Sequence, residues 1–147
     1  MKLKQVISIG ALVLGSSAAI AGNVQPAQVT ITLNADGSGS ATGDLFSARF
    51  ADNDFEVIGC GVRRYDDGVD GVYAYIFCQA ANEVSVNADP ENGSKICYSE
   101  NPALIEALAS LNDYSYITFA WDAEGTCTAI GNSTNSFYLP EKLGPDT

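Results

Sequence analysis

The sequence predicts a small, mainly β domain with one short α-helix and two disulfides. Three observations lead to this prediction. Several short runs alternate polar and apolar residues, as half-buried strands do. The chain has four cysteines, an even number, and no histidine. One segment combines helical spacing of apolar residues with an N-terminal cap. A small antiparallel barrel and a two-layer β-sandwich both fit these observations.

The first residues have the features of a cleaved signal peptide. Lys2 and Lys4 precede an apolar run over residues 6–14, and small residues follow up to the Ala-Ile-Ala site at 19–21. The apolar run is shorter than the roughly 20 residues that a membrane-spanning helix needs. We therefore expect residues 1–21 to be removed, leaving no membrane anchor and a secreted or periplasmic protein.

The remaining chain is one domain with a strong negative charge. We expect a single β-rich domain over residues 22–140 and a flexible tail over 141–147. The formal net charge of the whole chain is −11, and loss of the two lysines in residues 1–21 makes it −13. Nucleic acids and anionic lipids are bound by clustered basic residues. The sequence therefore argues against both as partners.

The four cysteines are Cys60, Cys78, Cys97 and Cys127. An even number of cysteines in an exported chain predicts two disulfides, and three pairings remain open. Their wide spacing and the absence of histidine argue against a zinc site, which usually contains close cysteine pairs. We expect structural disulfides that each contribute about 2–4 kcal/mol to stability.

Turn signals divide the chain into short predicted strands. Residues 72–80 alternate most clearly, with Tyr73, Tyr75 and Phe77 on one face and Ile76 and Cys78 on the other. The other predicted strand regions are residues 28–33, 38–50, 55–62, 114–121 and 126–130, and residues 137–139 are a candidate for the last strand of the sheet.

One helix is predicted after residue 100. Asn101 is a suitable N-cap, Pro102 fits the first helical position, and Leu104 and Leu108 lie on one stripe.

From about residue 40, the order of the predicted elements is three strands, a helix and two strands. This order resembles that of the OB-fold, a small Greek-key barrel. A β-sandwich with one covering helix agrees with the same order.

The absence of histidine excludes the usual Ser-His-Asp, Cys-His and His-metal sites. Only carboxylates remain as catalytic groups, so a small hydrolase with two acids across a cleft is one alternative function. Since no nucleophile–base signature is present, the sequence favours a protein without catalytic residues. The acidic candidates are Glu56, Asp66, Asp67, Asp70, Glu83, Glu106 and Asp122.

The densest acidic turn is the main candidate site for a cofactor, and the acidic segments 52–54 and 89–92 are weaker candidates. Asp66, Asp67 and Asp70 alternate with Gly68 and Gly71. Hard oxygen ligands on a tight loop suit calcium, although the spacing is not that of an EF-hand. The alternative is a solvated hairpin turn, where Asp and Gly are favoured by the backbone geometry. No other cofactor is expected.

The tyrosines are the candidate ligand-binding residues. Tyr73 and Tyr75 lie on one predicted strand, and Tyr114 and Tyr116 lie on another. Tyrosines on an exposed sheet face bind sugars or protein partners, and the alternative is that they fill the core. We therefore expect an exported, non-catalytic binding module for an extracytoplasmic protein or carbohydrate. A structural subunit of a surface or toxin-like assembly is a further alternative, and the oligomeric state stays open.

Overall fold

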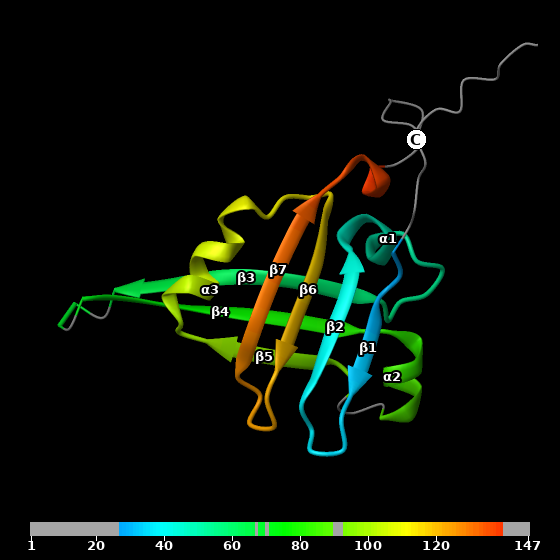
Figure 1. Cartoon of the computed structure of the whole chain (residues 1–147), viewed down its shortest axis with the longest axis horizontal. Helices are drawn as coiled ribbons and strands as arrows, with labels where there is room; N and C mark the ends of the chain where they lie inside the picture. The colour runs from blue at the N-terminus through cyan, green and yellow to red at the C-terminus, as the bar shows by residue number, and fades with distance from the viewer. Residues whose placement is uncertain (1–26, 67, 70, 90–92, 140–147) are drawn as a thin grey trace, which may run out of the picture.

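The computed structural model describes residues 27–66, 68–69, 71–89 and 93–139, and within them two antiparallel β-sheets face each other. The front sheet in Figure 1 has the order β1-β2-β6-β7, and the sheet behind it has the order β3-β4-β5. Their strands cross at a steep angle (Figure 1). Of the two expected architectures, the structure is the two-layer sandwich. The strands are β1 (Thr30–Leu33), β2 (Gly39–Asp44), β3 (Val57–Asp66), β4 (Val72–Ala81), β5 (Lys95–Ser99), β6 (Ser115–Trp121) and β7 (Cys127–Thr134).

The core lies between the two sheets. Ile76 of β4 and Ile117 and Phe119 of β6 are fully buried there. Trp121 is also buried, and its Nε1 donates to the Gly37 carbonyl at 3.1 Å, which satisfies the polar atom of the ring. The alternation of apolar residues along β4 and β6 thus sets which face of each strand enters the core.

Three short α-helices are described where the sequence analysis expects one. The expected helix is present as α3 (Pro102–Ala107), and Asn101 Oδ1 accepts from the Ala103 N–H at 3.0 Å, which confirms the predicted cap. A 3₁₀ turn, η1 (Leu108–Ser110), continues it. The unpredicted helices are α1 (Leu45–Arg49) and α2 (Glu83–Ala88), capped by Asp44 and Asn82. The candidate strand at 137–139 is wrong, because a 3₁₀ turn, η2 (Ser136–Tyr138), occupies this region.

The strands differ from the sequence-based prediction in several places: β3 and β7 each continue four residues beyond their predicted ends, to Asp66 and Thr134. The region 38–50 is a strand only as far as Asp44, because the Asp44 side chain caps α1 immediately afterwards. Strand β5 was not predicted, since its five residues lie between a polar segment and the predicted helix, with no tight turn in the sequence to pair them with a neighbouring strand. The expected signal peptide and C-terminal tail lie outside the described residues. Among the described helices, none is long and apolar enough to cross a membrane.

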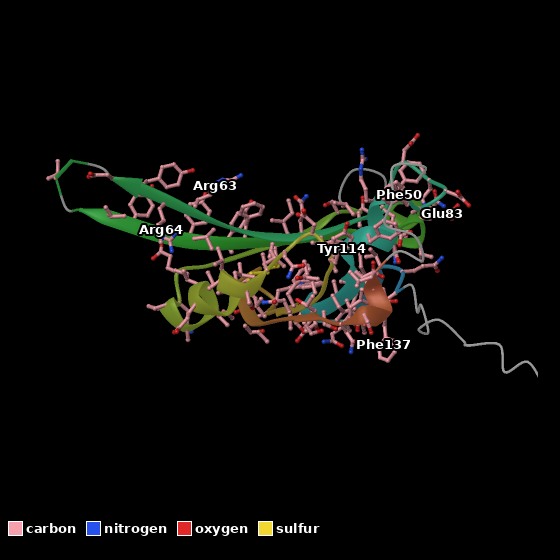
Figure 2. The ribbon with its side chains drawn as sticks, turned by 90° about the horizontal axis from the view of Figure 1, so that it is seen from above. Phe50, Arg63, Arg64, Glu83, Tyr114 and Phe137 are labelled. Carbon is pink, nitrogen blue, oxygen red and sulfur yellow. A yellow bond between two sulfur atoms is a disulfide. The ribbon has the colours of Figure 1, made fainter. Side chains whose placement is uncertain are left out.

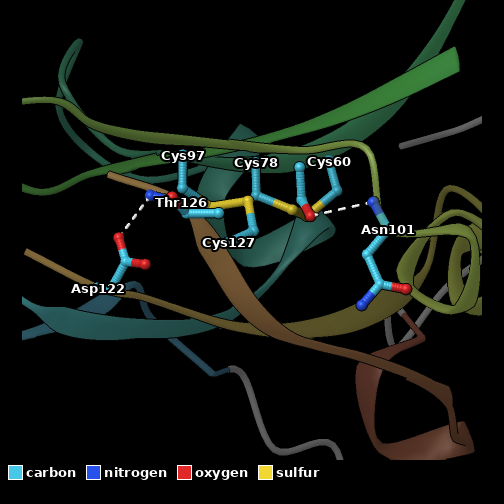
Figure 3. Close-up of a disulfide and its surroundings, with 8 residues drawn as sticks. Cys60, Cys78, Cys97, Asn101, Asp122, Thr126 and Cys127 are labelled. Carbon is cyan, nitrogen blue, oxygen red and sulfur yellow. Dashed lines mark hydrogen bonds between the residues drawn. A yellow bond between two sulfur atoms is a disulfide. The ribbon is translucent and has the colours of Figure 1, made fainter. Parts of the chain in front are cut away.

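Two disulfides are present, as the even cysteine count predicts. Cys60–Cys78 joins β3 to β4, and Cys97–Cys127 joins β5 to β7 and so links the two sheets (Figure 3). Beside the second disulfide, the Tyr98 N–H donates to the Gly125 carbonyl at 3.2 Å. Disulfides persist in oxidising compartments, so this pairing agrees with export from the cytoplasm.

Asp44 is a buried carboxylate that holds the first described residues to the sandwich. Its Oδ2 accepts from the Ala27 N–H and its Oδ1 accepts from the Ser47 N–H, both at 2.6 Å. The Asp44 N–H donates in turn to the Ala27 carbonyl at 2.9 Å. Both carboxylate oxygens are therefore satisfied by backbone donors, as a buried charge requires.

Candidate binding surface

The two sheets present different side chains on their outer faces. On the four-stranded sheet, two outward rows of register partners consist of small or hydroxyl-bearing residues. They are Thr30-Thr42-Thr118-Gly131 and Thr32-Ser40-Ala120-Ala129. On the three-stranded sheet, the outward rows are Tyr65-Tyr73, Arg63-Tyr75 and Gly61-Phe77-Tyr98. We call the surface formed by Tyr65, Tyr73, Tyr75, Phe77 and Tyr98 the aromatic face.

The aromatic face is continuous across three strands and open to solvent. The ring centroids of Tyr65 lie 5.4 Å from Tyr73 and 5.9 Å from Tyr75, with interplanar angles of 23° and 12°. Tyr75 meets Tyr98 edge-on at 6.2 Å. Tyr65, Tyr73 and Tyr98 are 44%, 48% and 54% exposed. Side chains of this size are normally packed, so their exposure here marks a surface suited to a partner.

A glycine and an arginine complete this surface. A Cβ at Gly61 would lie 2.8 Å from the Phe77 ring, so the missing side chain leaves room for that ring to lie across β3. The Arg63 guanidinium carbon is 4.8 Å from the centroid of the same ring, a cation–π contact. Figure 2 shows Arg63 and Arg64 on opposite sides of β3, so one cation belongs to the aromatic face.

A shallow depression lies at the edge of the aromatic face. It has a volume of about 500 Å³ and is lined by Tyr75, Tyr98, Ser99, Glu100 and Thr126. Glu100 contributes a carboxylate, and Asp122 and Glu124 belong to the turn that ends at Thr126. Two aromatic rings beside the Glu100 side chain form a site that favours a positively charged group.

The pKa of Tyr75 is raised above its ordinary value of 10.0. The main cause is a side-chain hydrogen bond with Tyr65, and partial burial and the neighbouring tyrosine add to the shift. These causes all favour the protonated hydroxyl, and they outweigh the opposing charge of Arg63. Tyr75 therefore stays neutral and keeps its hydrogen bond over the whole physiological range.

We expect Tyr75 to ionise later than a free tyrosine in an alkaline titration followed by tyrosinate absorbance. The pKa of Tyr75 is higher in the folded chain than in the unfolded chain. The contribution of Tyr75 to stability is therefore complete below pH 10.0, and it is lost as the pH rises through the folded-state pKa. In Tyr65→Phe, the main cause of the shift is removed, so the late ionisation should move toward the ordinary value. If the last tyrosine ionisation of this variant is as late as that of the parent chain, the assignment is contradicted.

The structure brings two of the four predicted tyrosines together. Tyr73 and Tyr75 lie on the aromatic face, as their alternation in β4 predicts. Tyr114 precedes β6, and its ring lies 6.3 Å from Phe46 in α1. Tyr116 is on the outer face of the other sheet, stacked on Tyr138 at 5.2 Å. These two tyrosines therefore do not extend the candidate surface.

Two members of the aromatic face, Tyr65 and Tyr98, were missed by sequence reasoning. Tyr65 and Tyr73 each lie one residue outside the hairpin end pair Asp66 and Val72, so the hairpin itself could have revealed that they are opposite each other. Tyr98 next to the buried Cys97 gives a weaker signal, because its strand was not predicted.

The acidic turn is described only in part. Asp66 Oδ1 accepts from the Gly68 N–H at 2.9 Å, the hydrogen bond of an ordinary turn. Asp67 and Asp70 lie outside the described residues, so the calcium site stays a prediction. In the described part of the chain, one group has metal-ligand spacing. It consists of the sulfurs of Cys78, Cys97 and Cys127, and all three are bonded in disulfides.

Several carboxylates proposed as catalytic groups bind backbone donors instead. Glu56 Oε1 accepts from the Val29 N–H at 2.7 Å, and Asp122 Oδ1 accepts from the Thr126 N–H at 2.8 Å (Figure 3). Such contacts shape loops and fix the chain before β1. They give Glu56 and Asp122 a structural role that accounts for their positions.

The chain matches no protein-family model, no curated protein and no solved structure. The described surface is therefore the feature from which a function can be inferred.

Proposed function

We propose that this chain is an exported, non-catalytic binding module that recognises an extracytoplasmic protein through its aromatic face. The supporting observation is the concentration of exposed aromatic side chains on one sheet, with Arg63 among them, while the outer face of the other sheet carries mainly small residues. Tyrosine and arginine are the residues that most often anchor protein interfaces.

The packing of the rings favours a protein over a carbohydrate. A sugar stacks on an aromatic ring through its apolar face, which requires a free ring face. Tyr65 lies nearly parallel to both Tyr73 and Tyr75, so these rings already stack on one another. The exposed ring edges and hydroxyls remain available, and they suit the mixed polar and apolar contacts of a protein interface.

Charge favours a partner with a basic surface. The chain has a formal net charge of −11, and Glu100 lines the depression between Tyr75 and Tyr98. A lysine or arginine of the partner placed there would contact both rings and a carboxylate. The contact of Arg63 with Phe77 is an example of the same interaction within the chain.

A photoreactive amino acid placed at single positions of the chain in its own host tests this proposal. At position 98, on the aromatic face, we expect a defined protein adduct. At position 118, an exposed position on the outer face of the other sheet, we expect none. A polysaccharide adduct at position 98, equal adducts at both positions, or no adduct at either would contradict the proposal.

The same adduct provides a test of the side chains. The double variant Tyr73→Ser and Tyr98→Ser should abolish the crosslink formed from a photoreactive residue at position 96, which is also exposed on this face. Because both tyrosines are about half exposed, we expect the free energy of unfolding to change by at most about 1 kcal/mol. Added salt should weaken the adduct if the partner is basic. An adduct that persists in the double variant would contradict the role of these rings.

A further inference from the structure

The four cysteines form one continuous group between the sheets. Cys60, Cys78 and Cys97 are successive register partners across β3, β4 and β5, and Cys127 reaches them from β7 (Figure 3). The sulfurs of Cys78, Cys97 and Cys127 all lie within 4.8 Å of one another. The Cys78 sulfur, although bonded to Cys60, is therefore close to both sulfurs of the other disulfide.

A different disulfide fits the same backbone. Cys78 lies directly opposite Cys97 in the β4–β5 ladder, as it lies directly opposite Cys60 in the β3–β4 ladder. Directly opposed residues of an antiparallel pair have Cβ atoms about 4.5–5.5 Å apart, near the range that a disulfide spans. A Cys78–Cys97 disulfide would thus require no change of strand register.

We propose that this group is a thiol–disulfide exchange site that reacts with an external dithiol. The dithiol first opens Cys60–Cys78, and the Cys78 thiolate then attacks the Cys97 sulfur. The product contains a Cys78–Cys97 disulfide and free thiols at Cys60 and Cys127.

The electrons and protons balance over these steps. One thiolate of the dithiol bonds to the Cys60 sulfur, and Cys78 leaves as a thiolate. The second thiolate of the dithiol displaces Cys60, so the dithiol becomes a disulfide and has supplied two electrons. The Cys78 thiolate then forms a bond to Cys97 while the Cys97–Cys127 bond breaks. The Cys60 and Cys127 thiolates each take up one proton released by the dithiol.

Burial determines where the external dithiol reacts. Cys78, Cys97 and Cys127 are buried, whereas Cys60 is half-buried and lies on β3, an edge strand of its sheet. Thiol–disulfide exchange requires access to the attacked sulfur. Attack at Cys60 releases Cys78 as the leaving group, which is the cysteine positioned next to the second disulfide.

The exchange changes which parts of the chain are covalently joined. In the starting protein, Cys97–Cys127 links the two sheets. In the product, Cys78–Cys97 joins two neighbouring strands of the same sheet, so the covalent link between the sheets is lost. This inference does not depend on the proposed binding function, because it involves only the cysteines.

Limited reduction of the mature chain with dithiothreitol, followed by acid quenching, alkylation in denaturant and peptide mapping, tests the inference. We expect molecules with one remaining disulfide to include a population alkylated at Cys60 and Cys127, with Cys78 joined to Cys97. Alkylation at Cys60 and Cys78 alone, with Cys97–Cys127 intact throughout, would overturn the proposal.

Two single variants serve as a matched pair that needs no reductant. In Cys60→Ser, Cys78 is left as a free thiol beside the second disulfide, so we expect alkylation of Cys127 in part of the population. In Cys78→Ser, the free thiol is Cys60, which is not among the three sulfurs that lie within 4.8 Å of one another, so Cys97–Cys127 should stay intact. Identical behaviour of the two variants would contradict the assigned role of Cys78.

Discussion

Replacing Cys97 and Cys127 together by alanine is expected to lower the free energy of unfolding by about 4 kcal/mol, measured by urea denaturation of the oxidised protein. Their disulfide closes a loop of 30 residues and links the two sheets. Among the described residues, one isolated β-bridge connects β5 to the start of β7, and it joins Tyr98 to Thr126. Few other interactions are therefore available to hold this edge of the sandwich together.

The double variant Cys60→Ala and Cys78→Ala is the control for this prediction. Its disulfide lies in a hairpin whose two strands pair over ten residues each, so the native hairpin should persist without it. Chain entropy alone gives a loss of about 3 kcal/mol, and residual hairpin pairing in the unfolded chain would reduce it. A loss below about 1 kcal/mol for the Cys97 and Cys127 variant would show that other contacts hold the sheets together.

Asp44→Ala is expected to destabilise the protein by about 3 kcal/mol, measured by thermal or urea unfolding. The substitution removes the buried carboxylate that accepts from the N–H groups of Ala27 and Ser47. Both donors would lose a charged acceptor, and α1 would lose its N-cap. Hydrogen exchange at these two amides should accelerate in the variant.

Asp44→Asn is the matched control for the buried carboxylate. The amide keeps one oxygen acceptor, so it can retain the cap of α1 or the contact with Ala27, but not both in their present form. We therefore expect an intermediate loss of stability. Equal losses in the alanine and asparagine variants, both below about 1 kcal/mol, would show that the two hydrogen bonds contribute little.

Parts of the fold with a strong local pattern were predicted well. The nine-residue alternation at 72–80 corresponds to β4. One face of that strand enters the core, and the other face carries the rings of the aromatic face. The start of α3 was predicted because Asn101 and Pro102 act within a single turn. The number of disulfides followed from composition, but their pairing did not, since Cys78 has both Cys60 and Cys97 as register partners.

The missed features depend on contacts that no local pattern records. Helices of five and six residues, such as α1 and α2, are too short to show an apolar period. Alternation indicates which face of its own strand a tyrosine occupies, but not which sheet that strand joins. For this reason Tyr116 was grouped with Tyr75 although the two lie on opposite layers, and Tyr98 was left out.

The pairing of β2 with β6 has a consequence for how the chain folds during synthesis. Ala41 of β2 lies opposite Phe119 of β6, so the central pair of the four-stranded sheet joins residues whose numbers differ by 78. Bringing such distant segments together is slow, and it requires most of the chain to be present. A ribosome must therefore have made nearly the whole domain before this sheet can form. Until then the nascent chain lacks the core that lies between the two sheets.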